Sequence, residues 1–166
     1  MISKIFKIPN SIIFNSLNKF KGLKFRKQII YDKSNLKIIN DSKSTSFSST
    51  VNLLCSNENI YWIVGGSFKK GDKFVLKKKY YKNIRAYIIG LNKKYFVNQF
   101  KNKINFIYLK KLRNAILSIK KDIKYDQSKK TILFSPAAAS FDQFKNFEHR
   151  GHIFNSLIKK IGVYED

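Results

Sequence analysis

The chain has 166 residues, which fits one domain, and its 43% hydrophobic and 15% aromatic content excludes an intrinsically disordered protein. It holds 34 Lys and Arg residues against 10 Asp and Glu residues, and the net charge of +24 is typical of proteins that bind nucleic acid or an anionic membrane surface. Only four of these cations are Arg, and Lys is abundant together with Ile, Asn, Phe and Tyr, residues that share AT-rich codons. We therefore interpret most of the charge as compositional drift on solvated faces, with a selected anion-binding surface as the alternative.

The first element expected is an amphipathic helix near the start of the chain. Its apolar residues stand at helical spacing: Ile12, Ile13, Leu17 and Phe20. The segment is basic but contains no Arg, so the pattern favours an ordinary helix over a transit peptide. Two β-rich runs follow at 28–31 and 36–39, and the turn residues at 32–35 between them predict a hairpin.

Strands and helices then alternate along the chain. We expect strands at 60–64, 86–89, 106–108 and 131–134. We expect helices at 45–54 with Ser44 or Thr45 near the cap, at 95–100, at 109–119, and from Phe144 or Phe147 to Ile161, with a short helix or irregular segment at 74–81. The alternation of continuous apolar strands with helices predicts an α/β fold, a mostly parallel sheet with helices on both faces, preceded by one helix and a β-hairpin.

The sequence gives no sign of a membrane span or a metal site. No apolar run approaches the roughly 20 residues of a membrane-spanning helix. Cys55 is the only cysteine, so neither an internal disulfide nor a cysteine-based metal site is possible, and this fits a reducing cytoplasm. His149 and His152 lack a third ligand nearby and are interpreted as surface or core histidines. Glu148 and Arg150 are expected to form a solvated or helix-anchoring pair.

Three polar clusters follow strands of the predicted sheet, at 40–45, 65–72 and 135–140. Because ligands of open α/β sheets bind beyond the carboxyl ends of the strands, the clusters are expected to converge on one site. Each cluster alone also fits a structural role: helix capping, a glycine turn, and a capping box between Ser140 and Gln143. The 65–72 cluster is not a Walker A loop, because Asp72-Lys73 stands where a Lys followed by Ser or Thr is needed. No Gly-x-Ser-x-Gly motif surrounds Ser140, which argues against a serine nucleophile.

The three clusters in this order resemble the C-terminal domain of a known enzyme family. The motifs are Asn40-Asp41-Ser42-Lys43-Ser44-Thr45, then Gly65-Gly66 with Lys69 and Asp72, then the long run 135–151 that reads Ser-Pro-Ala-Ala-Ala-Ser-Phe-Asp-Gln-Phe-Lys-Asn-Phe-Glu-His-Arg-Gly. They resemble the D-glutamate-adding ligases of the ATP-dependent Mur ligase family, which act in peptidoglycan synthesis. By this resemblance residues 1–22 correspond to the last helix of the central domain plus the linker. Residues 23–166 correspond to the Rossmann-like, amino-acid-binding C-terminal domain.

The resemblance also implies a reaction and a set of site residues. In the family, ATP phosphorylates the alanine carboxylate of UDP-N-acetylmuramoyl-L-alanine, and the amine of D-glutamate attacks the acyl phosphate. Carried over by position, one D-glutamate carboxylate would be held by Lys69 and Thr45, and the other by Ser140 and the Phe147 backbone. Arg26 and Asp41 would contact the nucleotide, and Lys43 would lie near the transferring phosphate as the catalytic cation. No residue is assigned to a metal.

The chain also departs from the family pattern. Lys24-Phe25-Arg26 and Gln28 stand where the family has Pro-His-Arg and an acid. There is no Walker A loop, no central-domain metal ligand and no UDP-binding domain, so ATP and Mg²⁺ would be bound mainly by absent domains. We expect the chain alone to be inactive. It would be an incomplete sequence, a split gene product that works with a partner chain, or a decayed remnant, in each case cytoplasmic. The alternatives from another class are a basic nucleic-acid-binding module, which we consider less favoured, and a scaffold for an acidic partner.

Overall fold

A six-stranded sheet forms the centre of the protein. The computed structural model describes residues 5–20 and 22–164. The strands are β1 (Gln28–Lys33), β2 (Leu36–Asn40), β3 (Ile60–Val64), β4 (Ile84–Ile89), β5 (Asn105–Lys110) and β6 (Lys130–Phe134), in the order β1-β2-β6-β3-β4-β5. The helices are α2 (Asn10–Lys19), α3 (Phe47–Ser56), α4 (Lys93–Phe100), α5 (Leu112–Ile123) and α6 (Phe147–Ile161), with a 3₁₀ helix η1 (Lys78–Asn83).

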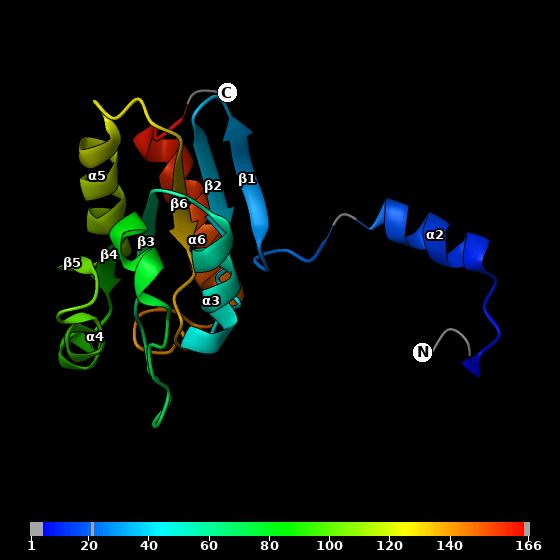
Figure 1. Cartoon of the computed structure of the whole chain (residues 1–166), viewed down its shortest axis with the longest axis horizontal. Coiled ribbons are helices and arrows are strands. Elements are labelled where there is room, and N and C mark those ends of the chain that lie inside the picture. Colours follow the sequence, from blue (N-terminus) through cyan, green and yellow to red (C-terminus); the bar gives the residue numbers. More distant parts are fainter. Residues whose placement is uncertain (1–4, 21, 165–166) are drawn as a thin grey trace.

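All neighbouring strands are parallel except β1, which pairs antiparallel with β2 (Figure 1). This confirms the mostly parallel sheet and the hairpin predicted from the sequence. The hairpin turn is tight because Ser34 adopts a left-handed conformation, with φ of 53°. Because β2, β6, β3 and β4 run parallel to one another, their carboxyl ends lie at one edge of the sheet.

Helices cover both faces of the sheet, as predicted. On one face α3 and α4 bury an aromatic-rich core that includes Phe47, Trp62 and Phe100. On the other face α5 and α6 pack over a second core that includes Tyr87 and Phe154. Every residue of β3 is buried because its alternate side chains enter the two different cores, which explains the unbroken apolar run in the sequence.

Several element boundaries differ from the prediction, and capping explains the start of α3. Helix α3 starts at Phe47 because the side chain of Ser46 accepts a hydrogen bond from the backbone of Ser49. Helix α6 has one of its two predicted starts, Phe147, and the predicted end, Ile161. The capping box predicted between Ser140 and Gln143 is wrong. The cap of α6 is Asn146, whose side-chain oxygen accepts a hydrogen bond from the His149 amide at 2.7 Å.

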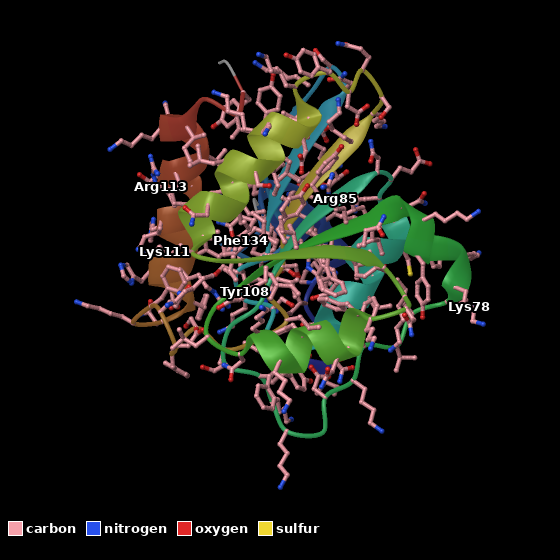
Figure 2. The ribbon with its side chains drawn as sticks, turned by 90° about the vertical axis from the view of Figure 1, so that its left-hand side faces the viewer. Lys78, Arg85, Tyr108, Lys111, Arg113 and Phe134 are labelled. Atoms are coloured by element: carbon pink, nitrogen blue, oxygen red, sulfur yellow. The ribbon has the colours of Figure 1, made fainter. Side chains whose placement is uncertain are left out.

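The predicted first helix exists as α2, but it stands apart from the body of the protein (Figure 1). None of its residues is buried, and the apolar side chains of Ile12, Leu17 and Phe20 are each more than half exposed. Cationic side chains such as Lys78, Lys111 and Arg113 lie at the periphery of the body, whereas Phe134 lies inside it (Figure 2). Within the described ranges, none of the helices has the length and apolarity needed to cross a bilayer.

Candidate functional site

The three polar clusters meet at the carboxyl edge of the sheet, as the sequence predicts. The Asp41 carboxylate accepts a hydrogen bond of 2.8 Å from the Ser135 hydroxyl, which joins the loop after β2 to the loop after β6. The backbones of Ser67 and Ala139 exchange two hydrogen bonds of 2.9 Å, which join the loop after β3 to the same loop. A single polar surface therefore spans the ends of three adjacent strands.

Asp41 lies beneath this surface with only 4% of its area exposed. Its Oδ1 accepts a hydrogen bond of 3.0 Å from the Lys27 amide, and its Oδ2 accepts the one from Ser135. Burial raises the pKa of Asp41 above its usual range, although the hydrogen bonds and the nearby charges of Lys27 and Arg26 oppose that shift. Because both of its oxygens accept hydrogen bonds, the Asp41 carboxylate fixes the backbone of Lys27, the residue next to Arg26.

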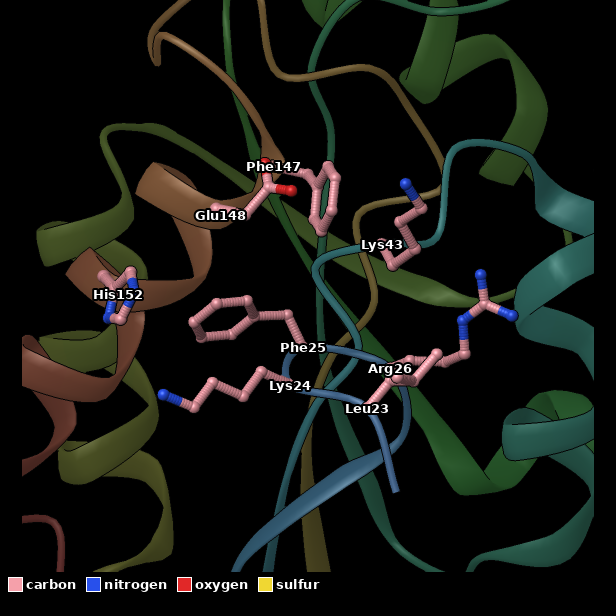
Figure 3. A pocket seen from close by; sticks show the side chains of 8 residues that line it. All are labelled: Leu23, Lys24, Phe25, Arg26, Lys43, Phe147, Glu148 and His152. Carbon is pink, nitrogen blue, oxygen red and sulfur yellow. The ribbon is translucent and has the colours of Figure 1, made fainter. Parts of the chain in front are cut away.

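A groove of about 400 Å³ lies beside these loops (Figure 3). Its walls are Leu23, Lys24, Phe25, Arg26, Lys43, Phe147, Glu148 and His152. The Lys43 ammonium lies 3.7 Å from the centre of the Phe147 ring, within cation–π range. Three of the predicted site residues, Arg26, Lys43 and Phe147, therefore share one groove, and Asp41 supports it from below.

The other predicted residues do not line this groove. Thr45 and Lys69 are exposed on the loops after β2 and β3. Ser140 is 3% exposed, and its carbonyl accepts hydrogen bonds from the amides of Gln143 and Phe144. Ser140 follows Ala139, whose backbone pairs with Ser67, so the Ser140 and Lys69 loops adjoin each other. The structure thus places these three residues around the same edge, outside the groove.

The segment of residues 23–28, which we call the linker segment, is seated on helix α6 by Phe25. The Phe25 ring is 3% exposed and meets the His152 ring edge-on, with 4.7 Å between ring centres. Gly151 leaves room for that ring, because a Cβ at Gly151 would lie 2.4 Å from Phe25 Cδ1. The sequence did not predict this packing role for Phe25.

The predicted pair of Glu148 and Arg150 is wrong, and the residue near the site that the sequence reasoning missed is Arg150. Its side chain is buried, with 1% exposed, while Glu148 is exposed, so the two do not form a pair. The guanidinium instead donates to Ser42 Oγ, Ser42 O and Ala138 O. Helical spacing carries a signal for this burial, because Arg150, Phe154 and Ile158 recur every four residues on the buried stripe of α6.

Groups that could bind a metal are sparse in this part of the protein. Across residues 5–20 and 22–164, no three side chains of His, Cys, Asp or Glu lie together in a way that could hold a metal ion. His149 and His152 serve in packing and local hydrogen bonding: His149 Nδ1 accepts a hydrogen bond from the Lys145 amide, and His152 contacts Phe25. The site offers cations, hydroxyls and backbone amides, a set that suits carboxylate and phosphate ligands.

This architecture is an α/β fold with a mostly parallel sheet and helices on both faces. It shares its fold with a murein peptide ligase from Psychrobacter arcticus, at a TM-score of 0.53 and 12% identity, over 92% of this chain and 33% of that chain. No protein-family model matches the sequence. Relatives named UDP-N-acetylmuramoylalanine–D-glutamate ligase are similar in sequence.

The relative from the Wolbachia endosymbiont of Brugia malayi is 37% identical over 96% of this chain and 32% of its own length. That from Rickettsia prowazekii is 36% identical over 96% of this chain and 36% of its own length, and that from Hydrogenobaculum is 35% identical over 89% of this chain. Over almost its whole length the chain is similar to UDP-N-acetylmuramoylalanine–D-glutamate ligases. It spans about a third of the length of these relatives and matches their C-terminal part.

Proposed function

We propose that this chain is the C-terminal part of a ligase that adds D-glutamate to UDP-N-acetylmuramoyl-L-alanine, and that it presents D-glutamate to an acyl phosphate. One observation carries the proposal: in a chain similar to these ligases, three loops bearing Lys43, Lys69 and Ser140 meet at the carboxyl edge of a parallel sheet. D-glutamate carries two carboxylates, and fixed cations with hydroxyl and amide donors are the groups that bind carboxylates.

The amino-acid site of the proposal uses residues on two sides of this edge. Lys69 and Thr45 bind one carboxylate of D-glutamate, and their exposure leaves the ammonium and the hydroxyl free to do so. Ser140 and the Phe147 amide bind the other carboxylate. Phe147 is the first residue of α6, where backbone N–H groups lack helical partners and the helix dipole favours an anion. The amine of the bound substrate then attacks the acyl phosphate carbon, and phosphate leaves.

The phosphate-binding side of the proposal is the groove. Lys43 neutralises the charge that develops on the transferring phosphoryl group, and the Phe147 ring holds its ammonium in place. Arg26 contacts the nucleotide from the linker segment. Asp41 is the second nucleotide contact of the proposal, and its hydrogen bonds to the Lys27 amide and the Ser135 hydroxyl also support the segment that carries Arg26.

The proposal includes ATP and Mg²⁺ because the similarity to these ligases implies them. The cations of the groove fit a polyphosphate, and ATP supplies the phosphoryl group that activates the alanine carboxylate. The described residues offer no metal cluster, so we assign the Mg²⁺ ligands and most of the ATP site to domains outside this chain. Residues 1–22 would carry the end of the preceding domain and the linker, and residues 23–166 the amino-acid-binding domain. The exposed apolar residues of α2 support that division. The remaining domains would lie in the same or a partner chain, in the cytoplasm.

The proposal is tested by titrating the 166-residue chain with D-glutamate and monitoring the amide NMR signals. L-glutamate is the control ligand. We expect amides near Lys69, Ser140 and Phe147 to shift with D-glutamate. Lys69→Ala and Ser140→Ala should each weaken binding at least tenfold, while Lys78→Ala on the distant η1 should not. Equal affinity in all three variants would refute the site.

Activity gives a second test. The chain alone should release no ADP from ATP in the presence of D-glutamate, whereas Lys69→Ala in a complete ligase should raise the KM for D-glutamate. D-glutamate-dependent ADP release from this chain alone would contradict the assignment of the ATP site to other domains.

A further inference from the structure

Arg150 is a buried cation without a carboxylate partner. The residue is 1% exposed, and none of the ion pairs within residues 5–20 and 22–164 includes it. Burial lowers the pKa of Arg150 to about 10, with the charge of Asp142 opposing that shift. A buried charge that is not paired with an opposite charge costs stability, and an apolar side chain of similar size avoids that cost. A role in stability alone therefore does not explain an arginine at this position.

The hydrogen bonds of Arg150 run in two directions. Nε donates to Ser42 Oγ at 3.1 Å and Nη2 donates to Ser42 O at 2.7 Å, on the loop after β2. Nη1 donates to Ala138 O at 3.0 Å, on the loop after β6. The rigid planar fork of arginine fixes these directions relative to each other, which a flexible lysine ammonium does not do.

The residues that Arg150 holds are neighbours of the proposed substrate contacts. Ser42 precedes Lys43, and Ala138 lies two residues before Ser140. The Ser42 hydroxyl also donates a hydrogen bond of 2.8 Å to Phe147 O, which continues the chain of contacts to the start of α6. A single side chain thus connects the backbone segments that carry three proposed ligand groups.

We infer that Arg150 is a positioning residue that sets the spacing of the Lys43, Ser140 and Phe147 segments around the bound amino acid. The inference rests on the proposed function for the identity of the ligand. The positioning itself is a property of the two loops and is measured without any ligand.

The first experiment compares amide NMR spectra of the 166-residue chain carrying Arg150→Lys or Arg150→Met with those carrying Arg113→Lys or Arg113→Met. Arg113 is the matched control because it is exposed on α5. Folded Arg150 variants should show shifted or broadened amides over residues 41–46 and 135–147, with the β4 and α5 amides unchanged. D-glutamate affinity should fall at least tenfold in them and stay unchanged in the Arg113 variants. Folded Arg150 variants with unperturbed loops and full affinity would overturn the inference.

A second measurement needs no variant, so the inference can be refuted even if the Arg150 variants fail to fold. In the unmodified chain the Arg150 Nε–H should exchange with water at least 100-fold more slowly than the Arg113 Nε–H, and equal rates would overturn the inference. If the unmodified chain gives no shift with D-glutamate, the proposed amino-acid site fails. The loop spectra and the exchange rates then still decide whether Arg150 fixes the loops.

Discussion

Replacing Gly151 by Ala should unseat the linker segment from helix α6. A Cβ at this position would lie 2.4 Å from Cδ1 and 2.6 Å from Cγ of Phe25. Carbon atoms pack at about 3.5–4.0 Å, so the Phe25 ring has to move by about 1 Å or more. Because the ring is buried against His152, we expect it to leave its packed position on α6 and not to shift within that position.

Two effects of opposite sign set the size of the change. Ala in place of Gly stabilises a helix interior by about 1 kcal/mol. Exposing a buried Phe side chain costs about 1.5–3 kcal/mol, so Gly151→Ala should destabilise the protein by about 0.5–2 kcal/mol net. Loss of the hydrogen bond from the Lys43 amide to the Phe25 carbonyl, 2.9 Å long, adds about 1 kcal/mol, so the total expected destabilisation is about 1.5–3 kcal/mol.

The assay is urea unfolding of Gly151→Ala, Phe25→Ala and the double variant, with Ser156→Ala on the exposed face of the same helix as the control. Without the Phe25 ring, Gly151→Ala should become stabilising by about 1 kcal/mol, because only the helix propensity remains. The sign of its effect therefore reverses between the two backgrounds. A stabilisation of equal size in both would refute the seating of Phe25 on Gly151.

Three further predictions concern Asp41, α2 and Tyr61. Because burial raises the pKa of Asp41 above 3.8, the stability linked to it is present below pH 3.8 and is lost as the pH rises through its folded-state pKa. Asp41→Asn should remove that part of the pH dependence in urea unfolding, and an unchanged profile would contradict the burial. Deletion of residues 1–19 should leave the thermal midpoint unchanged, because α2 buries none of its residues; a clear drop in calorimetry would show otherwise. Burial and a hydrogen bond to Asp126 raise the pKa of Tyr61 to about 12, so the absorbance change lost in Tyr61→Phe should titrate near that pH and not near 10.

Local patterns were enough to predict most of the fold. The strand β3 has the predicted bounds because a continuous apolar run ends at two glycines, and the hairpin follows from turn residues between two β-rich runs. The hydrogen bonds of Arg150 to Ser42 could not be predicted in the same way, because they join residues 108 positions apart in the sequence. Ser140 also carries a capping signal that Asn146 overrides, since the turn after Ser140 delays the start of α6.

The features of the site also divide into those that local sequence patterns predict and those that depend on tertiary contacts. The meeting of the three loops follows from the parallel sheet, whose strands have their carboxyl ends at one edge, and the alternation of strands and helices predicts that sheet. The strand order itself was not predicted. The seat of Phe25 against Gly151 depends on a tertiary contact between a linker and a helix more than a hundred residues away, and neither residue type signals it alone.

The excess of lysines affects how readily this protein associates with itself in solution. Like charges keep molecules apart in solution, so a net charge of +24 opposes self-association through the apolar side chains that α2 exposes. At about 0.1 M salt this repulsion reaches only about 10 Å, and it is neutralised wherever a polyanion coats the surface. The protein should therefore stay dispersed in dilute buffer and precipitate on added salt or RNA, and this behaviour follows from the excess of lysines without any specific binding.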